Sequence, residues 1–132
     1  MRTAHGLALA LSASFRLATA SPCSTSSLLY VTSYPSAYPG NGKLLTLKLD
    51  QSKLQTIAES DSCGPYPSWL TPVGDDILYC VNEAWGGDHG DLSALKINDD
   101  LSFTKLSGGQ TVVGPVSTIV YGNGGRGLAI AD

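Results

Sequence analysis

Short apolar runs separated by turn-forming residues make up most of the sequence after an apolar leader. In the second run, Leu45, Leu47 and Leu49 share one face of an extended chain. Thr46 and Lys48 lie on the other face, and this alternation predicts a β-strand. About nine such runs follow the leader, and none has helical periodicity over a useful length. The predicted strands span residues 28–34, 43–49, 54–58, 68–72, 77–82, 91–97, 102–106, 117–121 and 128–131.

The same order of parts returns along the chain with a period of about 50 residues. Leu-Tyr-Val at residues 29–31 corresponds to Leu-Tyr-Cys at 78–80 and to Leu-Ala-Ile at 128–130. A Gly-Pro step precedes two of the predicted strands, at residues 64–65 and 114–115. A repeat of this length built from short strands is typical of β-propeller blades, each a four-stranded sheet. The sequence therefore predicts an all-β fold, a partial β-propeller of about two and a half four-stranded blades.

The predicted domain covers residues 21–132, with repeats at about 28–77 and 78–127 and the start of a third. The strand after each Gly-Pro step is expected to line the central channel, and the chain enters its first blade at the second strand. Closed propellers have about 4–8 blades, so we expect a piece of a longer protein, a truncated product, or a subunit that completes its ring by association. Unpaired blade edges would be available for self-association.

Residues 1–20 are predicted to be a secretory signal peptide. Arg2 and His5 give a weakly positive start, residues 7–15 are apolar, and Ala-Thr-Ala at 18–20 matches a cleavage site. The apolar run is too short to span a bilayer, so we expect a secreted, extracellular protein with no membrane segment after cleavage. The alternative is an ordinary N-terminal helix.

The net charge of −3 and the single, scattered lysines argue against nucleic acid as a partner, because that affinity needs clustered cations. Cys23, Cys63 and Cys80 allow at most one internal disulfide. A bond between Cys63 and Cys80 is conceivable, but hairpin pairing does not place them opposite each other. Cys80 by itself is predicted to be a small buried apolar residue of a strand. No cysteine and histidine have the spacing of a nucleophile pair or a zinc site.

Hairpin geometry gives one candidate site. A turn centred near Gly74 pairs residues whose numbers sum to about 148, which puts Asn82 opposite Tyr66 and Glu83 opposite Pro65. The end of one strand and the start of its inner neighbour then share a rim of the disc. A carboxylate at that rim could act as a general base or orient a substrate hydroxyl. The alternative is a solvated loop carboxylate or a turn cap.

Four short sequence segments resemble those of the seven-bladed lactonase family, which includes 6-phosphogluconolactonases and fungal carboxy-muconate cyclases. They are Leu-Tyr-Val-Thr-Ser-Tyr at 29–34, Gly-Pro-Tyr-Pro-Ser-Trp-Leu at 64–70, Leu-Tyr-Cys-Val-Asn-Glu at 78–83 and Gly-Pro-Val-Ser at 114–117. The leader and the Cys-Gly-Pro variant at 63–65 look like the secreted fungal branch. The resemblance covers residues 28–132 and implies a seven-bladed ring. It also implies hydrolysis of a sugar-acid lactone, or closure of a muconate to a muconolactone, with no cofactor and no metal.

The resemblance makes Glu83 the candidate catalytic residue, with Trp85 and Ser117 as candidate substrate-binding residues for a lactone or carboxylate. Trp85 could stack on a ring-shaped substrate, whereas Trp69 is predicted to lie in the apolar core between two blades. The family often has histidine where this chain has Ser117, and its other acids and cations would lie beyond Asp132. The alternatives are a non-catalytic secreted binding propeller and an inactive truncated product.

Two further patterns have simpler explanations. Residues 88–91 offer three potential metal ligands that are too few and too close together, so a polar hairpin loop is predicted. Residues 122–127 match G-x-G-x-x-G by letter, but a dinucleotide site needs a helix next, and a strand is predicted at 128–131. The sequence has no G-x-S-x-G nucleophile motif.

Overall fold

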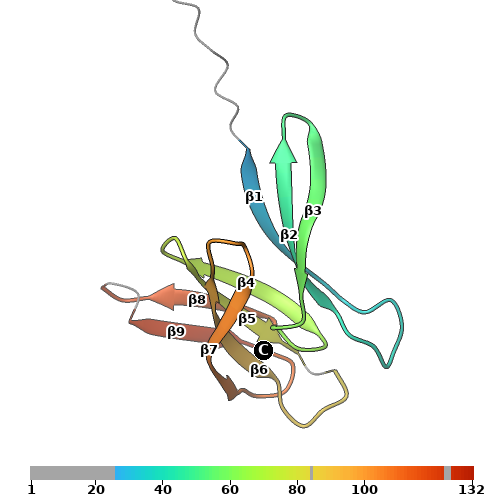
Figure 1. Ribbon diagram of the computed structural model, residues 1–132. Coiled ribbons are helices and arrows are strands. Elements are labelled where there is room, and N and C mark those ends of the chain that lie inside the picture. The colour runs from blue at the N-terminus through green and yellow to red at the C-terminus, as the bar shows by residue number, and fades with distance from the viewer. Residues whose placement is uncertain (1–25, 84, 124–125) are drawn as a thin grey trace, which may run out of the picture.

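The structure is a computed structural model that describes residues 26–83, 85–123 and 126–132 (Figure 1). The predicted signal peptide at 1–20 lies outside the described residues. The described chain contains strands and no helix, as predicted. The strands are β1 (Ser27–Ser33), β2 (Lys43–Asp50), β3 (Lys53–Ser60), β4 (Pro67–Val73), β5 (Ile77–Asn82), β6 (Asp91–Ile97), β7 (Phe103–Gln110), β8 (Ser117–Tyr121) and β9 (Gly127–Ala131).

The strands form three antiparallel sheets that follow one another along the chain. The first sheet has the order β1-β2-β3, the second β4-β5-β6-β7 and the third β8-β9. The second sheet is thus a complete four-stranded blade, flanked by one of three strands and one of two. β4 contacts β1 on one side and β8 on the other, so the sheets succeed one another around β4 (Figure 1). The prediction of an all-β partial propeller is confirmed.

An irregularity at the same place in both repeats supports the predicted period. The register between β2 and β3 shifts between Thr46 and Leu47, and that between β6 and β7 shifts between Ala94 and Leu95. Several strand ends differ from the prediction, most of all the end of β7. Residues 107–110 lie beyond the predicted strand at 102–106, but they continue β7 and pair with β6 as far as Asp91. Backbone hydrogen bonding extends this strand although Gly108 and Gly109 lower its intrinsic propensity.

The main apolar core lies between the first and second sheets. Its fully buried members are Leu44, Cys63, Leu78, Cys80 and Leu95, with Tyr30, Leu70, Ile97 and Phe103 packed around them. The rings of Tyr30 and Phe103 meet edge to face, with centroids 5.9 Å apart. Burying one leucine contributes about 1.5–3 kcal/mol, so this cluster is the main force that joins the two sheets.

Alternation along β2 follows the predicted period, and the buried face is the one that carries Thr46. Leu44 and Thr46 are fully buried, whereas Leu45, Leu47 and Leu49 are only partly buried. The Leu44 side faces the second sheet, which removes it from water. The Thr46 hydroxyl oxygen is buried there and has no hydrogen-bond partner among the described residues. An unpaired buried hydroxyl costs about 1–3 kcal/mol, so Thr46 weakens this face.

A disulfide joins Cys63 to Cys80, with their Cα atoms 5.7 Å apart. The ladder pairs Cys80 with Leu70, so the two cysteines are not strand partners. The bond instead links the segment that leads into β4 to the core face of β5. The interpretation of Cys80 as a simple buried apolar residue was therefore incomplete, since its sulfur is buried and also oxidised.

Candidate functional site

The candidate site lies where β1 and β5 end, at a rim shared by the first two sheets. Tyr34 follows the last residue of β1, and Glu83 follows the last residue of β5. The two strands hold equivalent places in the repeat, β1 pairing with β2 as β5 pairs with β6, so equivalent ends meet at one rim. The Tyr34 hydroxyl donates a hydrogen bond to the Glu83 side chain. The Trp85 ring lies 6.4 Å from that of Tyr34, centroid to centroid. The structure thus brings Glu83 and Trp85 together, with a tyrosine that was not predicted.

The hairpin register that led to Glu83 was wrong by about one residue. Asn82 pairs with Pro67 rather than Tyr66, and the Glu83 amide donates to the Tyr66 carbonyl at 3.0 Å. The turn is centred on Asp75 rather than Gly74, since Val73 pairs with Ile77, and the bulge between Pro67 and Trp69 then reduces the error towards the end of the strand. Glu83 still lies beside the start of β4, as expected.

Asn82 holds the chain that carries Glu83. Its side chain is almost fully buried and accepts a hydrogen bond from the Tyr66 amide at 2.8 Å. Its side-chain nitrogen donates to a carboxylate oxygen of Asp91 at 3.1 Å. Gly64 has φ +86°, and a Cβ there would lie 2.9 Å from that nitrogen, so this turn favours glycine. One buried amide therefore connects three segments and fixes the base of the site.

The rim also carries a small pocket of about 220 Å³, lined by residues 34–38 with Tyr66 and Trp85. Tyr38 stacks on Tyr66 with ring centroids 6.1 Å apart and planes 24° from parallel. Tyr66 is buried, whereas Tyr34, Tyr38 and Trp85 are exposed by 50%, 71% and 69%. Tyr38 lies between the predicted strands at 28–34 and 43–49, and the sequence pattern gives no reason to bring it beside Trp85.

Burial raises the pKa of Tyr34, and the hydrogen bond to Glu83 and the negative charge of that carboxylate raise the pKa further. The phenol therefore keeps its proton to a higher pH than an ordinary tyrosine. The arrangement is a neutral hydroxyl that donates to a half-buried carboxylate. Such a pair can accept a proton at Glu83, with the Tyr34 hydroxyl fixing the position of the carboxylate.

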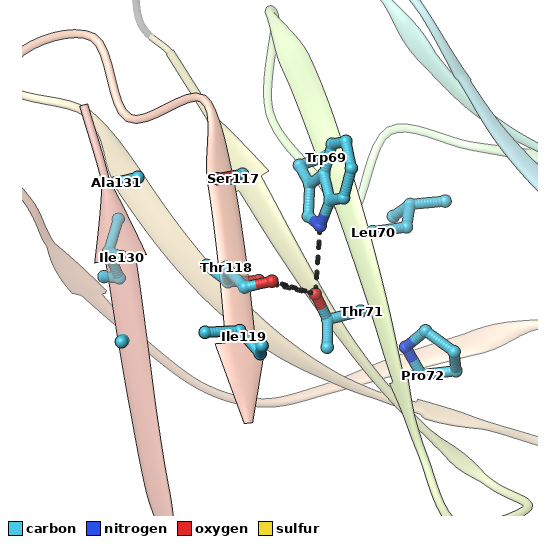
Figure 2. A pocket seen from close by; sticks show the side chains of 10 residues that line it. Trp69, Leu70, Thr71, Pro72, Ser117, Thr118, Ile119, Ile130 and Ala131 are labelled. Carbon is cyan, nitrogen blue, oxygen red and sulfur yellow. Dashed lines mark hydrogen bonds between the residues drawn. The ribbon is translucent and has the colours of Figure 1, made fainter. Parts of the chain in front are cut away.

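Ser117 lies apart from this pocket. It begins β8 and lines a second hollow of about 630 Å³ between β4 and the third sheet. Figure 2 shows this hollow, in which Thr71 of β4 is hydrogen-bonded to Thr118 of β8 at 2.7 Å between hydroxyl oxygens. The Trp69 indole nitrogen donates to Thr71 at 3.1 Å (Figure 2). Trp69 is 46% exposed, so its predicted place in an inter-blade core was wrong.

The 88–91 loop does not form a metal centre in the structure. His89 contacts Gln110 through its Nε2 atom at 2.9 Å, and Asp91 is engaged by Asn82. Across residues 26–83, 85–123 and 126–132, no group of three or more His, Cys, Asp or Glu side chains could hold a metal ion. A search of the same residues also found no helix of the length and apolarity needed to cross a membrane.

The stacked antiparallel sheets and their repeated irregularity define the class as a β-propeller. The sequence profile of the family described as "Lactonase, 7-bladed beta-propeller" matches residues 28–132. The chain belongs to this lactonase family. Comparison with curated proteins and with solved structures gave no significant match.

Proposed function

We propose that this chain provides one rim of a lactone-processing propeller site, in which Glu83 handles the proton of the reaction. The observation that carries the proposal is the hydrogen bond from Tyr34 to Glu83 beside Trp85. Membership of the lactonase family supports the reaction class. The proposed substrate is a sugar-acid lactone, whose ring is of a size to pack against the exposed Trp85 indole.

The chemistry needs one proton acceptor and one donor. In hydrolysis, water attacks the lactone carbonyl carbon, Glu83 accepts a proton from that water, and the ring C–O bond breaks. The leaving ring oxygen then receives that proton from Glu83, and the neighbouring Tyr34 hydroxyl assists the transfer. In the alternative reaction, a muconate carboxylate oxygen adds to a carbon–carbon double bond and the neighbouring carbon receives a proton. The same acid–base pair would serve either direction of lactone chemistry.

A carboxylate or phosphate on the substrate needs a cation, and the pocket lining contains neither lysine nor arginine. Lys43 is paired with Asp61 at 2.6 Å. We therefore propose that further blades of a seven-bladed ring supply the anion-binding groups. β1 and β9 are edge strands of their sheets and expose Leu28, Leu29 and Ile130, which supports completion of the ring by further blades or by self-association. Size-exclusion chromatography of the expressed chain distinguishes a monomer from an assembly.

We further propose that the protein is secreted. The disulfide between Cys63 and Cys80 suits an oxidising compartment, and the leader at 1–20 has the composition of a signal peptide. N-terminal sequencing of protein from culture medium tests this proposal. A mature start near Ser21 is expected, and an intact N-terminus on protein retained in cells would contradict it.

The catalytic proposal is tested by proton release from glucono-δ-lactone, with Glu83→Gln as the variant and Glu59→Gln as a control at an exposed carboxylate. We expect a rate above buffer for the unaltered chain, a loss of about 100-fold or more for Glu83→Gln, and no loss for Glu59→Gln. No rate above buffer with the unaltered chain would remove the enzymatic proposal for this chain. That outcome would favour the second candidate, a non-catalytic binding propeller. Ser117 also supports this candidate, because the family often has histidine at that position.

A further inference from the structure

We propose that the rim pocket binds an organic cation of the quaternary ammonium class. Its walls are four aromatic side chains from three separate segments, namely Tyr34 and Tyr38 after β1, Tyr66 before β4, and Trp85 after β5. Aromatic side chains that converge on one small space form the kind of cage that recognises such ligands. The inference rests on this pocket and is independent of lactone chemistry.

The rings are held in place by contacts between the segments. Tyr38 stacks on the buried Tyr66, and Tyr34 packs at a 45° tilt against Trp85. The Tyr38 hydroxyl also sits close to Gly86, where a Cβ would come within 3.2 Å of it and where φ is +80°. The two loops that carry the exposed rings thus meet, with glycine at the contact. The enclosed volume of about 220 Å³ is below the range of ~300–1,000 Å³ typical of larger ligands and suits a small head group.

The charge beside the pocket favours a cation. Tyr34 donates its hydroxyl proton toward the Glu83 carboxylate, which places a negative charge behind one wall and makes the Tyr34 ring richer in electrons. An electron-rich ring face attracts a cation more strongly. The pocket lining contains no lysine or arginine that would repel it. A small anion would find no cationic side chain in this lining and would lie beside the Glu83 carboxylate.

The pocket by itself suits a ligand that needs few hydrogen bonds. Its lining offers few donors and acceptors besides Ser36 and the tyrosine hydroxyls, so the hydroxyl groups of a polyol would have to be met by further blades. The Tyr34 hydroxyl is already engaged by Glu83. Three exposed aromatic rings, Tyr34, Tyr38 and Trp85, remain as the contact surface. A trimethylammonium group can use these faces without hydrogen bonds.

The test compares choline with 3,3-dimethyl-1-butanol, its neutral isostere. The chain has two tryptophans, so the Trp69→Phe variant leaves Trp85 as the single indole reporter. We expect choline to change the Trp85 fluorescence saturably, and the neutral isostere to bind about tenfold more weakly. Sodium chloride at the same ionic strength controls for screening. Equal affinity for choline and its isostere, or no saturable change with choline, would overturn the proposal.

Variants locate the site through a second measurement, the saturation-transfer NMR signal of the choline methyl groups. Trp85→Ala should abolish the signal, and Glu83→Gln should weaken binding because the charge is lost while the Tyr34 contact keeps an acceptor. Trp69→Phe changes the other tryptophan, which lines a different hollow, and should bind as the unaltered chain does. Unchanged binding by both Trp85→Ala and Glu83→Gln would place the ligand elsewhere and contradict the proposal. If Trp85→Ala does not fold, Glu83→Gln alone still decides, because a full-strength signal from it would contradict the electrostatic argument.

Discussion

The junction between the first and second sheets differs in construction from the junction between the second and third. The first is apolar and closed, with Leu44, Leu78 and Leu95 buried around the Cys63–Cys80 disulfide. The second is held by polar contacts. Thr71 bonds Thr118, the Ser68 hydroxyl donates to the Pro115 carbonyl at 3.1 Å, and a hollow of about 630 Å³ remains beside them.

The difference shows that two sheets of this fold can be held together in two ways. Closely packed leucines contribute a large stabilising free energy without directional contacts. Hydroxyl groups give less free energy but fix the position of one strand against its neighbour. At the polar junction, the Pro115 ring also packs so closely against Gly90 that a Cβ at Gly90 would clash with it. We expect substitutions at the two junctions to change the free energy of unfolding by different amounts and, for one pair of substitutions, in opposite directions.

The largest expected effect comes from removing the disulfide at the apolar junction. Cys63→Ala with Cys80→Ala opens a covalent loop whose ends are 17 residues apart. Loss of such a bond should lower the free energy of unfolding by about 2–5 kcal/mol. Urea denaturation followed by circular dichroism measures it, with Cys23→Ala as the control. A loss below about 1 kcal/mol would show that the leucines alone close this junction.

Leucine truncation at the same junction should come next. Leu95→Ala removes a fully buried side chain and should cost about 3 kcal/mol of unfolding free energy. Ile119→Ala at the third sheet is the matched control, because that side chain is 66% exposed and its loss should change stability by no more than about 0.5 kcal/mol. Similar losses for the two variants in urea denaturation would contradict the distinction between the junctions.

The same substitution should have opposite effects at the two junctions. Thr71→Val breaks the hydrogen bonds to Thr118 and should destabilise by about 1 kcal/mol. Thr46→Val replaces a buried hydroxyl that has no partner among the described residues, and should stabilise by about 0.5–1 kcal/mol. Thermal and urea unfolding of both variants measure this difference. A destabilised Thr46→Val protein would indicate an unseen partner for that hydroxyl.

The smallest expected effect is a pH dependence at the rim of the apolar junction. The pKa of Tyr34 is raised in the folded state, so its contribution is fully present below the ordinary tyrosine pKa of about 10 and is lost as the pH rises through the folded value. Tyrosinate absorbance at 295 nm should show a late-titrating group in the native protein. Glu83→Gln should move that titration to lower pH, and an unchanged titration would separate Tyr34 from Glu83.

Much of the fold could be predicted because the information is local. Period-2 runs, Gly-Pro steps and the 50-residue repeat located all nine described strands, with errors only at their ends. Pairing of neighbouring strands also brought Glu83 to the start of β4, although the turn is centred on Asp75 rather than Gly74 and the Pro67–Trp69 bulge changes the register again. Bulges depend on the packing of the bent strand, which no local pattern reports.

What could not be predicted lies across the space between sheets. Tyr34 contacts Glu83 because the first and second sheets stack on each other. The pattern along one strand does not indicate how close it lies to a strand of another sheet. The same reason explains why Cys63 was not assigned to Cys80, since their bond joins a crossover to the face of β5. It also explains why β2 buries Thr46 rather than its three alternate leucines. Each of these outcomes depends on which face meets a neighbouring sheet.

The disulfide has one further consequence for how copies of this chain can associate. Cys63 and Cys80 enclose the whole of β4, the strand that touches both neighbouring sheets. While that bond is intact, β4 cannot separate from β5, so exchange of β4 alone between two molecules is blocked. Reduction would remove this tie and allow β4 to leave its hairpin, which would open a route to domain swapping.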